Sequence, residues 1–172
     1  MKSHGWATDH YETMNNSDIA ELPVKDIMDK DSVCFMWATS PLLPEALEVM
    51  KAWWFKFKTV AFVWNKKHKS WTDVANMGRW TMGNVEMVLL WVRWKPKRIK
   101  NNIRQLVVAE RTAHSAKPNE VRERIVELMW DLPRLELFCR DQADGWDALW
   151  DWIDGKDLRD SIPELINKTN EK

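Results

Sequence analysis

The chain has 172 residues, 45% of them hydrophobic, and its 26 basic side chains balance 26 acidic ones. This length suits a single domain with a substantial buried core. The apolar runs are too short and interrupted to cross a membrane, and MKSHGWATDH lacks the apolar stretch of a secretory signal. We therefore expect a cytoplasmic protein with no membrane partner.

The first half of the chain predicts a strand, a helix and a second strand. Ser17 is expected to begin a short helix that Pro23 ends. Residues 33–38 and 59–64 are nearly continuous apolar runs, typical of strands buried on both faces of a parallel sheet. An amphipathic helix begins between them at Pro44. This order predicts a right-handed βαβ unit.

The second half continues the pattern after an irregular segment, 65–82, that we expect to be a long loop. Such alternation predicts an α/β fold, with a mainly parallel sheet flanked by helices. A Rossmann-like sheet needs about six or seven strands, so we expect one N-terminal strand to be missing ahead of Met1. The predicted domain covers 1–156, and 157–172 form a peripheral helix or tail. Further strands are expected at 85–92, 106–109 and 135–139, with a helix at 118–129.

Charge is distributed unevenly along the chain. Residues 51–100 carry a net charge of +10, whereas residues 1–50 carry −6 and residues 101–172 carry −4. A basic middle third suggests a surface that faces a polyanion, and tryptophans among cations suit base stacking beside phosphate contacts. Solvated lysines and ordinary aromatic packing remain the alternatives. The candidate nucleic-acid-binding residues are Lys66, Lys67, Lys69, Trp71, Arg79, Trp80, Lys97 and Arg98.

The loop after the strand at 106–109 is the best candidate for a functional site. It carries His114, Ser115 and Lys117 and leads into a helix at Pro118. Functional loops of α/β proteins lie outside the carboxyl ends of their strands. The sequence has no glycine-rich nucleotide motif, no nucleophile elbow and no histidine pair with metal-ligand spacing. We therefore expect no metal.

Nine short motifs give the chain a family resemblance. In this order and spacing, they resemble the N6-adenine methyltransferases of the MT-A-seventy family over roughly His10 to Trp146. That family includes messenger-RNA adenosine methyltransferases and many bacterial and phage DNA adenine methyltransferases. The motifs are HYETM (10–14), ELPV (21–24), FMWATSP (35–41), LPEALEVMKAWWFKFKTVAFVWNK (43–66), GRWTMGNVEMVLL (78–90), KPKR (95–98), HSAKP (114–118), LELFCR (135–140) and GWD (145–147).

The resemblance implies a Rossmann-like methyltransferase fold, S-adenosylmethionine as the methyl donor and an adenine amino group as the acceptor. It implies catalytic roles for three residues: Tyr11, in a loop beside the target base, and Ser115 and Lys117, in a second active-site loop. A helix-capping Ser115, a solvated Lys117 and a core Phe138 are the alternatives. The residues that the resemblance places at the cofactor are Glu136, Leu137, Phe138 and Arg140.

Two departures from the family pattern affect the predicted activity. The family's catalytic tetrapeptide, Asp-Pro-Pro-Trp, which holds the adenine amine, is absent from this sequence. The family's Gly-Asn pair after GWD is replaced, and Trp150 and Asp151 occupy the nearest positions. Asp151 is therefore the candidate partner of the cofactor ribose, and Trp150 could crowd it.

We predict an S-adenosylmethionine-dependent N6-adenine methyltransferase that acts on nucleic acid, with DNA favoured over RNA and a phage or bacterial origin. Without the tetrapeptide, this chain could be inactive as it stands. The alternative is a non-catalytic, nucleic-acid-binding subunit that pairs with a homologous, active methyltransferase.

Overall fold

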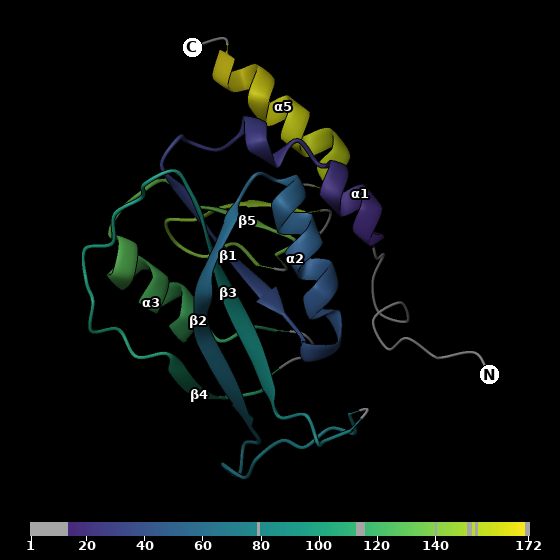
Figure 1. Ribbon diagram of the computed structural model, residues 1–172, viewed down its shortest axis with the longest axis vertical. Coiled ribbons are helices and arrows are strands. Elements are labelled where there is room, and N and C mark those ends of the chain that lie inside the picture. The colour runs from purple at the N-terminus through teal and green to yellow at the C-terminus, as the bar shows by residue number, and fades with distance from the viewer. Residues whose placement is uncertain are drawn as a thin grey trace, which may run out of the picture.

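The computed structural model describes residues 14–78, 80–112, 116–139, 141–150, 153 and 155–170. Within these ranges, a four-stranded sheet is packed between helices (Figure 1). The strands lie in the order β1-β3-β2-β4. Their bounds are Ser32–Ala38 for β1, Lys56–Lys67 for β2, Val85–Arg93 for β3 and Leu106–Glu110 for β4.

Helices and a second, small sheet complete the described part of the chain. Two short strands, β5 (Leu135–Leu137) and β6 (Asp147–Leu149), form a parallel pair. No described helix is long and apolar enough to cross a membrane. The helices are α1 (Asn16–Glu21), α2 (Leu43–Ala52), α3 (Asn119–Met129) and α5 (Leu158–Asn170), with 3-10 turns at Val24–Asp26 and Ser40–Leu42.

The four-stranded sheet is mixed. Strand β3 runs antiparallel to both β1 and β2, and only β2 and β4 pair in parallel. The α/β class is confirmed, but the expected mainly parallel sheet is wrong for these four strands. Continuous apolar runs reveal that both faces of a strand are buried, and they do not specify its direction. The βαβ unit is present in modified form, because β3 lies between the two parallel strands β1 and β2.

Helices α2 and α3 bury opposite faces of the sheet (Figure 1). Helix α2 follows the predicted amphipathic pattern and packs its apolar face on one side of β3. On the other side, α3 covers Phe62 and Trp64 of β2. The α2 side includes Ala46, Val49, Met50, Leu89 and Trp91, and the α3 side includes Phe62, Trp64, Val88, Val107, Val121 and Ile125.

The C-terminal helix α5 is anchored by its first two turns. Leu158 and Ile162 are fully buried and join the core on the α2 side, together with Leu22 and Val24. Figure 1 shows α5 lying beside α1 and the 3-10 turn that follows it. A sequence-based division at residue 157 remains a prediction, although these contacts tie the helix to the core.

Candidate active site at the sheet edge

The mutually parallel strands β1, β2 and β4 end at one edge of the sheet, where β3 begins. The register shows this directly, because Ala38 pairs with Met87 and Lys67 pairs with Glu110. Polar and aromatic side chains gather at this edge on the face that α3 covers. We call them the edge cluster: Trp37 from β1, Trp64 and Lys66 from β2, Glu86 from β3, and Lys117 from the segment that leads into α3.

A carboxylate held between two ammonium groups forms the centre of the edge cluster. Glu86 Oε1 lies 2.5 Å from Lys66 Nζ, and Glu86 Oε2 lies 2.5 Å from Lys117 Nζ. The Glu86 and Lys66 side chains are only 12% and 13% exposed, whereas that of Lys117 is 29% exposed. The trio therefore carries a net positive charge in a largely dry environment, with Lys117 as its accessible member.

The pKa of Glu86 lies below its usual value. Burial alone would raise this pKa, because it disfavours the charged carboxylate. The charges and hydrogen bonds of Lys117 and Lys66 outweigh burial and lower it. Glu86 is therefore ionised at neutral pH and holds both ammonium groups in place.

Two indole rings line the edge cluster. Lys117 Nζ lies 5.2 Å from the centre of the Trp37 ring, and Lys66 Nζ lies 5.4 Å from that of Trp64. The two rings meet edge to face, with centroids 6.0 Å apart and planes at 76°. Trp64 Nε1 also donates a hydrogen bond of 3.0 Å to the carbonyl oxygen of Ala109, which fixes its ring. Cations over fixed aromatic rings can bind an anionic or planar ligand.

The sequence predicts only part of this cluster. Its family resemblance places Lys117 in an active-site loop, and the structure places that side chain against Glu86 and Trp37. The basic middle third predicts a nucleic-acid-binding role for Lys66, but the structure pairs Lys66 with Glu86 and buries most of it. Glu86 itself was missed, although a lone carboxylate in the apolar run VEMVLLWV signals a buried partner.

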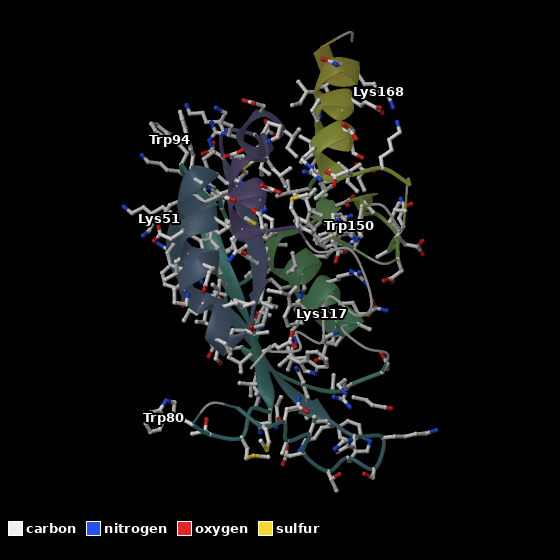
Figure 2. The ribbon with its side chains drawn as sticks, turned by 90° about the vertical axis from the view of Figure 1, so that its right-hand side faces the viewer. Lys51, Trp80, Trp94, Lys117, Trp150 and Lys168 are labelled. Atoms are coloured by element: carbon white, nitrogen blue, oxygen red, sulfur yellow. The ribbon has the colours of Figure 1, made fainter. Side chains whose placement is uncertain are left out.

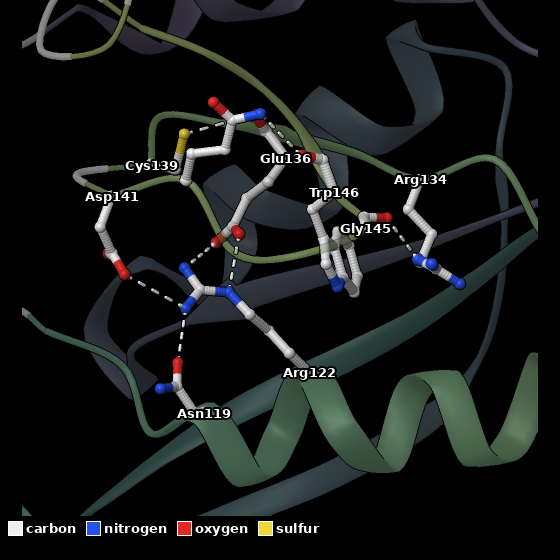
Figure 3. A network of polar contacts seen from close by, with 9 residues as sticks. Asn119, Arg122, Arg134, Glu136, Cys139, Asp141, Gly145 and Trp146 are labelled. Atoms are coloured by element: carbon white, nitrogen blue, oxygen red, sulfur yellow. Dashed lines mark hydrogen bonds and ion pairs between the residues drawn. The ribbon is translucent and has the colours of Figure 1, made fainter. Parts of the chain in front are cut away.

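A second polar network joins α3 to β5 (Figure 3). Arg122 donates to both carboxylate oxygens of Glu136, over 2.8 Å from Nε and 3.2 Å from Nη2. Its Nη1 donates to Asn119 Oδ1 at 2.7 Å and lies 3.6 Å from Asp141 Oδ2. Burial would lower the pKa of Arg122, but Glu136 and Asp141 raise it. The network fixes Glu136, because a two-pronged contact restricts both partners.

The other described cofactor candidates are mainly apolar in their contacts. Leu137 and Phe138 pack against the core on the α2 side. Phe138 has a left-handed backbone, with φ of 60°, and its ring lies 4.8 Å from that of Trp150. Five candidates from the sequence lie outside the described residues: Tyr11, Arg79, Ser115, Arg140 and Asp151.

The structure divides the predicted nucleic-acid-binding residues between two ends of the sheet. Lys69, Trp71 and Trp80 are exposed on the segment 68–84, which extends from the same edge as the edge cluster. Lys67 lies at its base, where its Nζ is 2.8 Å from Asp73 Oδ1. Lys97 and Arg98 are exposed at the opposite end, after β3. Figure 2 shows this separation through its labels on Trp80 and Trp94.

The sequence of this region also matches a known family. A model of the MT-A70 family matches residues 2–151. This is the MT-A-seventy family that the nine motifs resemble. The chain belongs to the MT-A70 family. Both the edge cluster and the Arg122 network fall inside the matched range.

Individual relatives of this MT-A70 chain include enzymes from bacteria and animals. A Type II methyltransferase, M.MunI, from Mycoplasma sp is 36% identical over 139 residues, which cover 80% of this chain and 57% of that protein. The N(6)-adenosine-methyltransferase MT-A70-like protein of Drosophila melanogaster is 26% identical, over 92% of this chain and 26% of that protein. The human N(6)-adenosine-methyltransferase catalytic subunit METTL3 is 23% identical, over 94% and 28%.

The MT-A70 chain thus spans only part of these relatives, from about a quarter to somewhat more than half of their length.

Among the described residues, no group of histidine, cysteine, aspartate and glutamate side chains could hold a metal ion.

Proposed function

We propose that this MT-A70 domain transfers a methyl group from S-adenosylmethionine to N6 of adenine in a nucleic acid, with DNA as the favoured substrate. The observation that carries the proposal is the edge cluster. It places an accessible cation, Lys117, and an aromatic ring, Trp37, where the parallel strands end. Ligands of open α/β sheets bind at that position.

The chemistry of the donor set fits S-adenosylmethionine. Lys117 is the accessible cation for the cofactor's carboxylate. Glu136 is fixed by Arg122 and keeps lone pairs that can accept from a ribose hydroxyl. Phe138 follows two residues after Glu136, at the end of β5, with its ring packed against Trp150. When bound, the cofactor supplies an electrophilic methyl group on a sulfonium.

The segment 68–84 is the proposed contact for the nucleic acid. It extends from the edge of the edge cluster and exposes 98% of Trp80, with Lys69 on the same segment. An exposed indole can stack on an unpaired base, and a lysine can neutralise a phosphate. Two roles remain predictions. Tyr11 is predicted to dock the extruded adenine, and Ser115 is predicted to lie in the second active-site loop.

One observation favours a second function. The sequence contains no Asp-Pro-Pro-Trp tetrapeptide, so the chain lacks the acceptor that the resemblance assigns to the adenine amine. A non-catalytic subunit that binds nucleic acid and pairs with an active methyltransferase needs no such acceptor. In that function, the segment 68–84 would be retained and the edge cluster would serve structure alone.

A methylation assay distinguishes the two functions. The chain is incubated with S-adenosylmethionine and adenine-containing DNA or RNA, and N6-methyladenine is measured by mass spectrometry of the digested nucleic acid. The enzyme function predicts product with the unaltered chain, and a loss of tenfold or more with Lys117→Ala, about 1.4 kcal/mol of transition-state stabilisation. The matched control is Lys100→Ala. Lys100 forms an ion pair with Glu127, and their side chains are 45% and 48% exposed, respectively.

Each outcome favours one function. Product formation that depends on Lys117 and not on Lys100 supports the enzyme. If no DNA or RNA is methylated, while nucleic acid is bound with the salt dependence expected for phosphate contacts, the partner-subunit function takes its place.

A further inference from the structure

Four exposed tryptophans have a backbone conformation that suits glycine. Trp54, Trp71, Trp94 and Trp130 have φ values of 66°, 61°, 57° and 68°. Their side chains are 64%, 64%, 66% and 64% exposed. A left-handed backbone brings Cβ too close to the following carbonyl oxygen, so residues other than glycine, asparagine and aspartate seldom adopt it.

Two of the four end helices in arrangements that favour glycine. After α2, the N–H of Trp54 donates to Lys51 O and the N–H of Phe55 donates to Met50 O, each over 3.0 Å. This is the Schellman pattern, and Trp54 occupies its left-handed position. After α3, the N–H of Trp130 donates to Val126 O at 2.7 Å, and Trp130 has φ of 68° with ψ of −166°, a combination almost confined to glycine.

The other two lie at turns next to strands. The N–H of Trp71 donates to His68 O at 2.8 Å, and the N–H of His68 donates to Thr72 O at 2.9 Å. The chain therefore makes a tight hairpin loop whose last residue, Trp71, is left-handed, and glycine is the usual residue there. Trp94 takes the first position after β3, where the chain turns away from the sheet.

In the described part of the chain, none of these four indoles is packed into the core, so burial of the side chain does not offset the strain of the backbone. Trp54 and Trp94 each lie near one lysine ammonium, at 5.5 Å from Lys25 and 4.8 Å from Lys30, but remain mostly in solvent. Among the residues that the structure describes, Phe138 is also left-handed, but it differs because it packs into the core and against Trp150. Strain at Phe138 is held by packing, whereas strain at the four exposed sites has no such support.

The composition of the chain points in the same direction. It has 13 tryptophans and only 5 glycines. Glycine makes up about 7% of an average protein, or roughly 12 residues in a chain of this length. The chain thus has more tryptophans and fewer glycines than expected, and four of the tryptophans occupy positions with a left-handed backbone.

We infer that residues 54, 71, 94 and 130 are glycine positions, and that the codon behind each is UGA, which the host of this gene translates as glycine. UGA is a codon that some genetic codes read as tryptophan and others as glycine, so one reassigned codon accounts for all four sites. The protein made in its own host then has no indole at these positions. Residue 71 is then a glycine and has no ring to stack on a base of the nucleic acid. Trp80, which is not left-handed, remains the exposed indole of the segment 68–84.

The nucleotide sequence of the gene tests the codon directly. Codons 54, 71, 94 and 130 should be UGA. Codons 53 and 64, for tryptophans that are buried and not left-handed, should be UGG. A UGG codon at any of the four left-handed positions, or UGA at both buried ones, would overturn the inference.

Thermal melts of the full chain test the conformational argument separately. Trp→Ala removes the indole but keeps Cβ, whereas Trp→Gly removes both, so only glycine relieves the backbone. At each of the four positions, the glycine variant should melt about 2–4 °C above the alanine variant. At Trp80, which is 98% exposed and not left-handed, glycine should melt at or below alanine. Glycine variants that melt no higher than their alanine counterparts at the four positions would refute it.

Discussion

Replacing Glu86 with glutamine should destabilise the protein more than any comparable change at a surface ion pair. The carboxylate accepts from two ammonium groups, Lys66 and Lys117, each 2.5 Å away. Glutamine has nearly the same shape but no charge, and its amide group presents donors to one of the two lysines. Glu86→Gln therefore leaves two neighbouring cations without a counter-charge.

The expected loss follows from the burial of the three side chains. Removing one partner of a buried ion pair costs about 3–5 kcal/mol. Lys117 is 29% exposed and can turn towards water, whereas Lys66 is only 13% exposed and cannot do so without disturbing β2. We therefore expect a loss of about 3 kcal/mol, near the lower end of that range. For a chain of this size, the melting temperature should fall by roughly 6–12 °C.

The assay is unfolding by heat and by urea at neutral pH, with Glu48→Gln as the control. Glu48 and Lys51 also form an ion pair of 2.8 Å, but their side chains are 73% and 64% exposed. Breaking this pair should change stability by no more than about 1 kcal/mol. Adding Lys66→Met to Glu86→Gln should recover part of the loss, because it removes one unpaired cation. Equal losses for the Glu86 and Glu48 variants would refute the reasoning.

Three further predictions concern pH, the cofactor and nucleic acid. Because the pKa of Glu86 in the folded protein lies below its ordinary value of 4.5, its stabilisation should be present above that pH and fade as the pH falls through the folded value. Urea midpoints should show this loss in the wild type and not in Glu86→Gln. In calorimetric titration, the chain as it stands should bind S-adenosylhomocysteine with a dissociation constant above about 1 µM, since it lacks the tetrapeptide and carries Trp150. Arg122→Met should weaken any binding further, because it releases Glu136. Replacing Lys69 with alanine should lower the salt dependence of nucleic-acid binding by roughly one unit, whereas Lys51→Ala should leave it unchanged.

The amino-acid sequence alone determined the family and most of the elements, although it gave no sign of the short strand β6. Apolar runs located the strands, and the amphipathic pattern of residues 118–129 located α3, because burial of a face is written in local periodicity. Nine ordered motifs pointed to the MT-A70 family, which the family match over residues 2–151 confirms. Lys117 could be singled out in the same way, since it belongs to one of these motifs.

Only the tertiary structure decided how these elements meet. The apolar run of β3 gave no sign of its direction, and the structure places β3 antiparallel between β1 and β2. The same pairing brings Glu86 to Lys66 and Lys117, which are 20 and 31 residues away along the chain. It also separates Lys69 from Lys97 and Arg98, because the segment 68–84 leads into β3 whereas Lys97 and Arg98 come after its other end. Such contacts depend on which strands pair and in which direction, and a continuous apolar run specifies neither.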